Sequence, residues 1–148
     1  MIALDTNTLV HARRAETPFH EQASQLLRDL AEGDRSWTMP WPCVNEFLRV
    51  ITHPRVFDPP TDLEIALRDL ESLLQSPSLV MIGEGRDHGR RMAETLRSGR
   101  TVGNLVHDAH IAALLSEHGI REIWTLDKDF MRFPGLRVRN PLEQDAPR

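Results

Sequence analysis

Four acidic side chains stand where a chain of alternating strands and helices places its reactive groups. Asp5 and Asp127 each end an apolar run, and Glu46 and Asp108 lie near the start of two helical patterns. Because open α/β sheets bind ligands beyond the carboxyl ends of their strands, we expect the four carboxylates at one edge of the sheet. Taken alone, Asp5 fits a helix cap equally well.

Carboxylates this close repel one another and raise one another's pKa unless they share a cation. Hard divalent cations prefer oxygen ligands, so the pattern predicts a Mg²⁺ or Mn²⁺ site. The expected ligands, which are also the expected catalytic residues, are Asp5, Glu46, Asp108 and Asp127. A metal held in this way can generate hydroxide and stabilise both oxygens of a phosphodiester displacement. The predicted chemistry is hydrolysis of RNA or DNA.

The elements that must position these acids follow from hydrophobic periodicity. Strands are expected at residues 1–4, 36–39, 79–82, 122–126 and 136–138. Helices are expected at residues 6–14, 18–33, 40–53, 63–74, 87–98 and 105–117, with the leucines of 63–74 facing the core. Strands that alternate with helices predict an α/β fold with a mainly parallel sheet of four to five strands. The length of 148 residues predicts a single domain over 1–148.

Composition limits the compartment and the partners. Cys43 is the only cysteine and lies in an apolar stretch, which predicts a buried, inert thiol and a reducing compartment. No apolar run approaches the ~20 residues of a membrane span, and no signal-peptide pattern opens the chain. We therefore expect a cytoplasmic protein without a membrane segment. The net charge of −4 argues against non-specific coating of nucleic acid.

The positive charge is nearly all arginine, since Lys128 is the only lysine. Arg86, Arg90 and Arg97 recur at helical spacing within one arginine-rich helix. A solvated helix face is one interpretation of this pattern. The other is a groove that contacts the RNA backbone beside the acids, because phosphate contacts supply affinity without sequence choice.

Four segments in this order resemble the motifs of PIN-domain ribonucleases, specifically the VapC-type toxins of bacterial toxin-antitoxin pairs. They are Asp5-Thr-Asn, Glu46 within Pro-Cys-Val-Asn-Glu-Phe, Asn104-Leu-Val-His-Asp108, and Trp124 through Leu136. The resemblance runs the length of the chain. It implies a three-layer α/β/α fold and a Mg²⁺-dependent endoribonuclease that cleaves structured cellular RNA. It also implies a homodimer, and inhibition of this type II toxin by a cognate antitoxin protein.

The resemblance assigns Asp5, Glu46 and Asp108 to metal ligation, directly or through water. For the fourth acid, Asp127 ends its strand and matches the usual position, whereas Asp129 serves instead or jointly in an alternative interpretation. One of this pair is expected to cap the short helix before Pro134 if it is not a ligand. The side chains expected to orient the ligands by hydrogen bonds, with capping or turn formation as the alternative, are Asn7, Thr6 and Thr125.

Other interpretations are weaker. Asp5-x-Asn7 is similar to a phosphoaspartyl phosphatase motif, but Asn7 stands where the general acid would be and cannot donate a proton as one. Gly83, Gly85 and Gly89 suggest a dinucleotide loop, yet the next strand ends too far away to supply the ribose-binding acid. A catalytically inactive domain that binds RNA or a partner is a further alternative. His107-Asp108 suggests an all-helical metal phosphohydrolase, but the four apolar strands contradict that architecture. The remaining histidines show no metal-ligand spacing and are expected at the surface or as caps.

Overall fold

The structure, a computed structural model, describes residues 1–143 and contains within them a five-stranded sheet. Its strands are β1 (Ile2–Leu4), β2 (Trp37–Pro40), β3 (Leu79–Ile82), β4 (Glu122–Trp124) and β5 (Arg137–Arg139). They lie in the order β3-β2-β1-β4-β5, and every neighbouring pair is parallel. The predicted α/β class, with a mainly parallel sheet of four to five strands, is confirmed.

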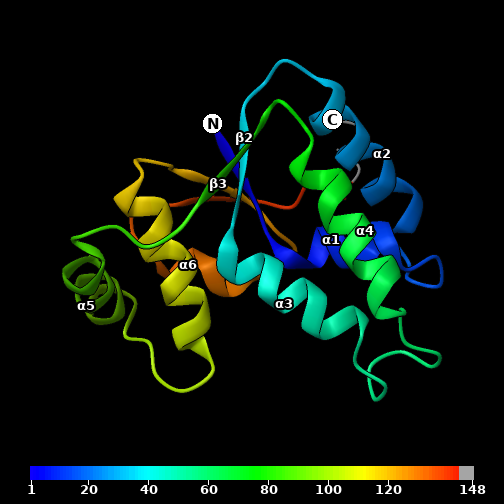
Figure 1. The fold of residues 1–148 in the computed structure, drawn as a ribbon. Helices are drawn as coiled ribbons and strands as arrows, with labels where there is room; N and C mark the ends of the chain where they lie inside the picture. Colours follow the sequence, from blue (N-terminus) through cyan, green and yellow to red (C-terminus); the bar gives the residue numbers. More distant parts are fainter. Residues whose placement is uncertain (144–148) are drawn as a thin grey trace.

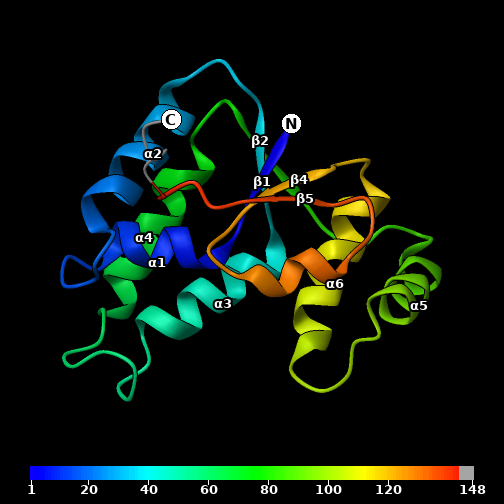
Figure 2. The same ribbon diagram turned by 180° about the vertical axis from the view of Figure 1, so that it is seen from behind.

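Helices cover both sides of this sheet. They are α1 (Thr6–Arg13), α2 (His20–Glu32), α3 (Trp41–Ile51), α4 (Leu63–Leu74), α5 (His88–Gly99), α6 (Leu105–Glu117) and the short 3₁₀ helix η1 (Lys128–Arg132). Figures 1 and 2 show α5 and α6 on one side of the sheet and α1, α2 and α4 on the other. The sheet is therefore the middle of three layers. Within the described residues, no helix is both long and apolar enough to cross a membrane.

The central strand β1 and its neighbour β2 are almost wholly apolar because they are covered on both faces. Every residue of β1 and β2 is buried, as expected for the centre of a parallel sheet. Edge strand β5 differs, since Arg137 and Arg139 are exposed. Charged side chains at an edge discourage pairing with another chain.

The order of the strands places a crevice beside β1. After β3 the chain crosses to the other side of β1 to form β4, so the direction of winding reverses between β1 and β4. The backbone N–H of Asp5 donates to the carbonyl oxygen of Trp124 at 3.1 Å and continues this pairing one residue past β1. Open α/β sheets bind ligands at such a reversal. Asp5 and the residues after β4 lie there.

One expectation about packing is wrong. Of the apolar side chains of α4, Ala66 and Leu73 are buried, but Leu63, Leu67 and Leu74 are 59%, 37% and 42% exposed. Helix α4 packs mainly against α3 at the outside of its layer. The helices that contact α4, which include α3 and, through the Arg13–Asp69 ion pair, α1, cover only part of its surface, so several apolar side chains are left partly in solvent.

Candidate active site

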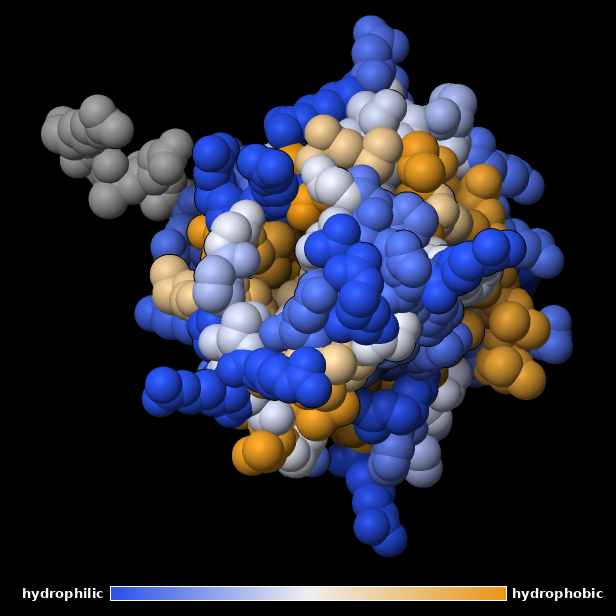
Figure 3. Space-filling view, turned by 90° about the vertical axis from the view of Figure 1, so that its left-hand side faces the viewer, coloured by the Kyte–Doolittle hydropathy of each residue, from blue (hydrophilic) through white to orange (hydrophobic). Residues whose placement is uncertain are grey.

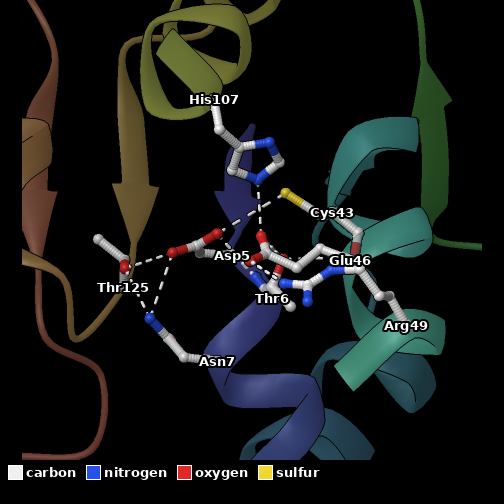
Figure 4. A network of polar contacts seen from close by, with 8 residues as sticks. All are labelled: Asp5, Thr6, Asn7, Cys43, Glu46, Arg49, His107 and Thr125. Atoms are coloured by element: carbon white, nitrogen blue, oxygen red, sulfur yellow. Dashed lines mark hydrogen bonds and ion pairs between the residues drawn. The ribbon is translucent and has the colours of Figure 1, made fainter. Parts of the chain in front are cut away.

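Asp5 follows β1 directly and is 5% exposed. Its Oδ1 accepts a hydrogen bond from the backbone N–H of Thr6 at 2.8 Å, so Asp5 itself, rather than Thr6 or Asn7, caps α1. Its Oδ2 accepts from the Thr125 hydroxyl at 2.6 Å and from Nδ2 of Asn7 at 3.2 Å (Figure 4). Burial raises the pKa of Asp5, while the bonds from Thr125 and Thr6 act in the opposite direction. Both oxygens are therefore fixed by donors of the protein.

The Thr125 hydroxyl joins three segments. It donates its one proton to Asp5 and accepts from Nδ2 of Asn7 at 3.0 Å and from the backbone N–H of Asp127 at 2.9 Å. The backbone N–H of Leu126 lies 3.4 Å from Oδ1 of Asn7, which fixes the orientation of the Asn7 amide. These are the contacts that a ligand-orienting role requires. That role for Asn7 and Thr125 stays a prediction.

Three further carboxylates gather beside Asp5. Asp108 comes from the first turn of α6, and Asp127 and Asp129 come from the start of η1. One oxygen of each lies within 4.8 Å of the others, and we call these three residues the acid trio. Oδ1 of Asp127 accepts from the backbone N–H of Asp129 at 2.8 Å and caps η1. The structure thus brings together both candidates for the fourth acid, with Asp127 half-buried and Asp129 exposed.

The acid trio is electrostatically strained without a cation. Burial and the charges of Asp127, Asp5 and Asp129 together raise the pKa of Asp108 to about 6, while the charge of His107 acts in the opposite direction. A bound cation would reverse this shift, because opposite charge favours the ionised carboxylate. A perturbed carboxyl in a cleft is also typical of functional sites.

Glu46 lies at the opposite wall, outside the trio. Its Oε2 accepts a hydrogen bond from Nε2 of His107 at 2.6 Å and lies 3.4 Å from the Thr6 hydroxyl, and Nη2 of Arg49 lies 3.5 Å from its Oε1 (Figure 4). The bond to His107 lowers the pKa of Glu46 and raises the pKa of His107. Both shifts favour the charged forms, a carboxylate on Glu46 and an imidazolium on His107. The contact of His107 with Glu46 was not predicted from the sequence, because the two residues lie 61 positions apart along the chain.

Cys43 packs beneath Asp5 from the first turns of α3. It is fully buried, and its Sγ lies 3.7 Å from Oδ1 of Asp5. Burial raises the pKa of the Cys43 thiol well above its ordinary value, and the charge of Asp5 adds to this. The expected burial of this thiol is confirmed, and its raised pKa disfavours the thiolate, which is the nucleophilic form.

Asp108, Asp127, Asp129 and Glu46 open into a pocket of about 860 Å³, the acidic pocket. Its rim carries side chains that sequence reasoning did not single out, chiefly Trp41, Arg49, Glu84 and His110. Trp41 is 42% exposed, which is unusual for so large an aromatic side chain. Its position at the start of a helix that carries Glu46 was the available signal.

The three arginines expected to contact RNA lie on α5 and in the loop before it. Arg86, Arg90 and Arg97 are all exposed, and none of them lines the acidic pocket as the described residues define it. Arg90 pairs with Glu94 at 2.9 Å and Asp87 at 3.9 Å. Figure 3 views the molecule from the α5 side and shows a largely hydrophilic surface with separate hydrophobic patches. Their contact with RNA stays a prediction, and Arg49 is the arginine that reaches the pocket.

A parallel three-layer fold with carboxylates gathered at the ends of its inner strands defines a class, the PIN domain. The family model described as PIN domain matches residues 2–136. Two solved structures support the same fold. VapBC2 from Rickettsia felis aligns with a TM-score of 0.66 at 20% identity, covering 94% of this chain and 98% of that one. VapC20 of Mycobacterium tuberculosis, described as a sarcin-ricin loop cleaving toxin, aligns with a TM-score of 0.65 at 17% identity, covering 93% and 99%.

Comparison with curated relatives shows which group of PIN-domain proteins this chain resembles. Ribonuclease VapC48 of Mycobacterium tuberculosis is 36% identical over 140 residues, which cover 93% of this chain and 94% of the relative. Ribonuclease VapC43 of the same organism is 33% identical over 143 residues, which cover 97% of each. The chain belongs to the PIN-domain family and, within it, to the VapC ribonucleases. The resemblance that the four sequence motifs carried is confirmed.

Proposed function

We propose that this protein is the toxin of a type II toxin-antitoxin pair and an endoribonuclease that cleaves structured cellular RNA with Mg²⁺ or Mn²⁺. The observation that carries the proposal is the acid trio beside the fully bonded Asp5. Its donors are all carboxylate oxygens, which is the set that a hard cation prefers. The charges of the neighbouring carboxylates add to burial in raising the pKa of Asp108, and a bound cation would counter both effects. The residues therefore fit such an ion.

Asp108, Asp127 and Asp129 are the residues that would hold the ion directly. The predicted ligation by Asp5 and Glu46, directly or through water, stays a prediction. A bound Mg²⁺ or Mn²⁺ would supply activated water and charge neutralisation at the phosphodiester. The carboxylate of Asp5 is held in a fixed orientation, because Thr125 and Asn7 both donate to its Oδ2. These hydrogen bonds make one wall of the site rigid. Across the pocket, His107 keeps Glu46 ionised by donating to it.

The rim of the acidic pocket offers contacts suited to single-stranded parts of a folded RNA. Trp41 presents an exposed aromatic face on which an unstacked base can lie. Arg49 is also exposed and presents a guanidinium, which matches phosphate geometry. Arg86, Arg90 and Arg97 are proposed as outer contacts to the RNA backbone. The description of VapC20 as a sarcin-ricin loop cleaving toxin supports a structured RNA as the substrate class.

Cleavage is tested with purified protein and a structured RNA, with Mg²⁺, Mn²⁺ or EDTA. We expect cleavage with either metal and none with EDTA, and loss of cleavage in Asp108→Asn. The matched control is Asp34→Asn, since Asp34 is an exposed acid outside the acidic pocket. Mapping RNA ends after brief expression then names the substrate. Cleavage that survives EDTA, or an Asp108→Asn protein as fast as the parent, contradicts the mechanism.

A cognate antitoxin and a homodimer are part of the proposal. The solved relatives include toxin-antitoxin complexes such as VapBC2, and an anionic pocket suits an inserted arginine of a partner. Co-expression of this protein with the one encoded by the neighbouring reading frame should yield a complex, and that partner protein should block RNA cleavage. Light scattering of the free protein should give twice the mass of 16.9 kDa. A protein that is recovered alone and active, and is harmless to its host, counts against an antitoxin.

The phosphatase alternative has less support. A phosphoaspartyl mechanism needs an accessible nucleophilic carboxylate, and Asp5 is 5% exposed with hydrogen bonds to both oxygens. Asn7 donates to Asp5 and Thr125, and an amide does not act as a general acid. An inactive binding domain would be shown by RNA binding without cleavage in the same metal series.

A further inference from the structure

A second group of side chains with metal-binding chemistry lies on the α5 side of the acidic pocket. Glu84 precedes α5, His88 is its first residue, and His110 comes from α6. One ligand atom of each lies within 4.8 Å of the others. We propose that Glu84, His88 and His110, the histidine cluster, form a Zn²⁺ site that ties α5 to α6. The proposal does not depend on ribonuclease activity.

The donors differ in kind from those of the acid trio. Two imidazoles and one carboxylate form the set that zinc takes in sites with three protein ligands, whereas magnesium prefers oxygen alone. His110 Nε2 already lies 2.9 Å from Oε1 of Glu84, and the His88 and His110 rings meet edge to face with centroids 5.1 Å apart. Tetrahedral bonds of ~2.0–2.1 Å would separate ligand atoms by roughly 3.3 Å. Small side-chain rotations would bring this geometry about.

The cluster is separate from the acid trio, although both border the acidic pocket. His110 follows Asp108 by two residues on α6, which turns its side chain by about 200° around the helix axis. Its partner Glu84 lies after β3, whereas the other two acids of the trio lie after β4. A cation at one group therefore does not use the ligands of the other.

A largely buried carboxylate lies behind the cluster. Oε2 of Glu117 lies 3.1 Å from Nδ1 of His88, and the two side chains are only 12% and 16% exposed. A carboxylate that holds the second nitrogen of a histidine is the usual support of a metal-bound imidazole, because it fixes the ring and its tautomer. Gly85 permits this arrangement, since a Cβ at that position would collide with the Glu117 carboxylate. Gly85 thus serves close packing here.

The charge of the cluster also favours a cation. Glu84 and Glu117 bring two carboxylates to two imidazoles, which are neutral when they bind a metal. A divalent ion would balance these two negative charges. It would also join the loop after β3 and the start of α5 to α6, so the bound metal should stabilise the folded protein.

The test is the change in melting temperature on adding Zn²⁺ to the full-length protein, with EDTA-treated protein as reference. We expect stabilisation of the parent, and loss of most of it in His88→Gln and in His110→Gln. His118→Gln is the matched control, because His118 also lies near this loop, 2.9 Å from the carbonyl oxygen of Gly83, yet is no member of the cluster. Asp127→Asn should keep the Zn²⁺ response, while both cluster variants should keep the response to Mg²⁺.

Equal Zn²⁺ stabilisation of parent, His88→Gln and His110→Gln would overturn the proposal, and so would its loss in Asp127→Asn alone. A second measurement needs no variant. X-ray absorption at the zinc edge, with one equivalent of Zn²⁺ on the parent, should show the multiple scattering of imidazole ligands. A shell of oxygen alone, or no binding at that ratio, overturns the site even if the variants fail to fold.

Discussion

Asp5 and Asp108 are both carboxylates with a raised pKa, but the protein holds them in opposite ways. Asp5 is buried and receives donors on both oxygens, from Thr6, Thr125 and Asn7. Asp108 is half-buried and faces the charges of other carboxylates. The first acid receives its hydrogen-bond donors from the protein, whereas the second faces other carboxylates and, in our proposal, binds a cation. We call Asp5 together with its three hydrogen-bond donors the rigid wall of the site. We call the carboxylate of Asp108, which faces other carboxylates, the unbalanced charge.

The largest effect should come from removing either charge. Asp5→Asn and Asp108→Asn should each lower the cleavage rate by about 10³-fold or more, since metal-assisted hydrolysis supplies several kcal/mol. Their stabilities should differ. Without metal, Asp108→Asn should raise the free energy of unfolding because repulsion is relieved. Asp5→Asn should gain less, because its new NH₂ group would face the donors that now serve Oδ2.

Single-turnover cleavage and urea unfolding in EDTA measure both quantities. An Asp5→Asn protein that cuts as fast as the parent would show that Asp5 has no part in catalysis. A gain in unfolding free energy for Asp5→Asn as large as that for Asp108→Asn would break the comparison, because the two sites would then be equally strained.

Thr125 tests the rigid wall alone. Thr125→Val removes the hydroxyl that donates to Asp5 and accepts from Asn7 and the Asp127 backbone. Loss of a group that orients a ligand costs about 10–100-fold in metal affinity or activity. Thr125→Ser keeps the hydroxyl and should stay close to the parent. Mn²⁺ titration of all three proteins provides the measurement, and equal affinities for Thr125→Val and Thr125→Ser would remove Thr125 from the site.

The unbalanced charge predicts a pH dependence. The folded-state pKa of Asp108, about 6, lies above its ordinary value of 3.8, so ionisation is costlier in the folded chain than in the unfolded one. Without metal, the contribution of Asp108 to the free energy of unfolding is therefore fully favourable below about pH 3.8 and is lost as the pH rises through about 6. Metal needs the ionised form, so affinity should fall about tenfold per pH unit below about pH 6. Mn²⁺ titrations at several pH values, with Asp108→Asn as the control, measure the slope, and a flat profile contradicts the shift.

The smallest effect should separate the two acids at η1. Asp127 is half-buried and rigid as a helix cap, whereas Asp129 is exposed. Mn²⁺ at about 100 times its dissociation constant stabilises a folded protein by ~2.7 kcal/mol, a shift of several degrees in a chain of this size. We expect Asp127→Asn to lose that shift and Asp129→Asn to keep most of it. The reverse result would make Asp129 the principal ligand.

The sequence determined the layout of the fold and the position of most acids. Continuous apolar runs that stop at Asp5 and near Asp127 predict strands with carboxylates at their ends, and the alternation with helices predicts a parallel sheet. The same local patterns placed Asp108 in the first turn of a helix. These features could be predicted because periodicity and strand ends are properties of neighbouring residues.

Only the tertiary structure decided which side chains meet. Thr125 reaches Asp5 across 120 positions and His107 reaches Glu46 across 61, and the histidine cluster joins residues that show no metal-ligand spacing along the chain. The exposure of the leucines of α4 could not be predicted for the same reason. Hydrophobic periodicity indicates which face of a helix is apolar, but not how much of that face other elements bury. Such contacts depend on strand order and on the packing of distant helices, which local patterns do not encode.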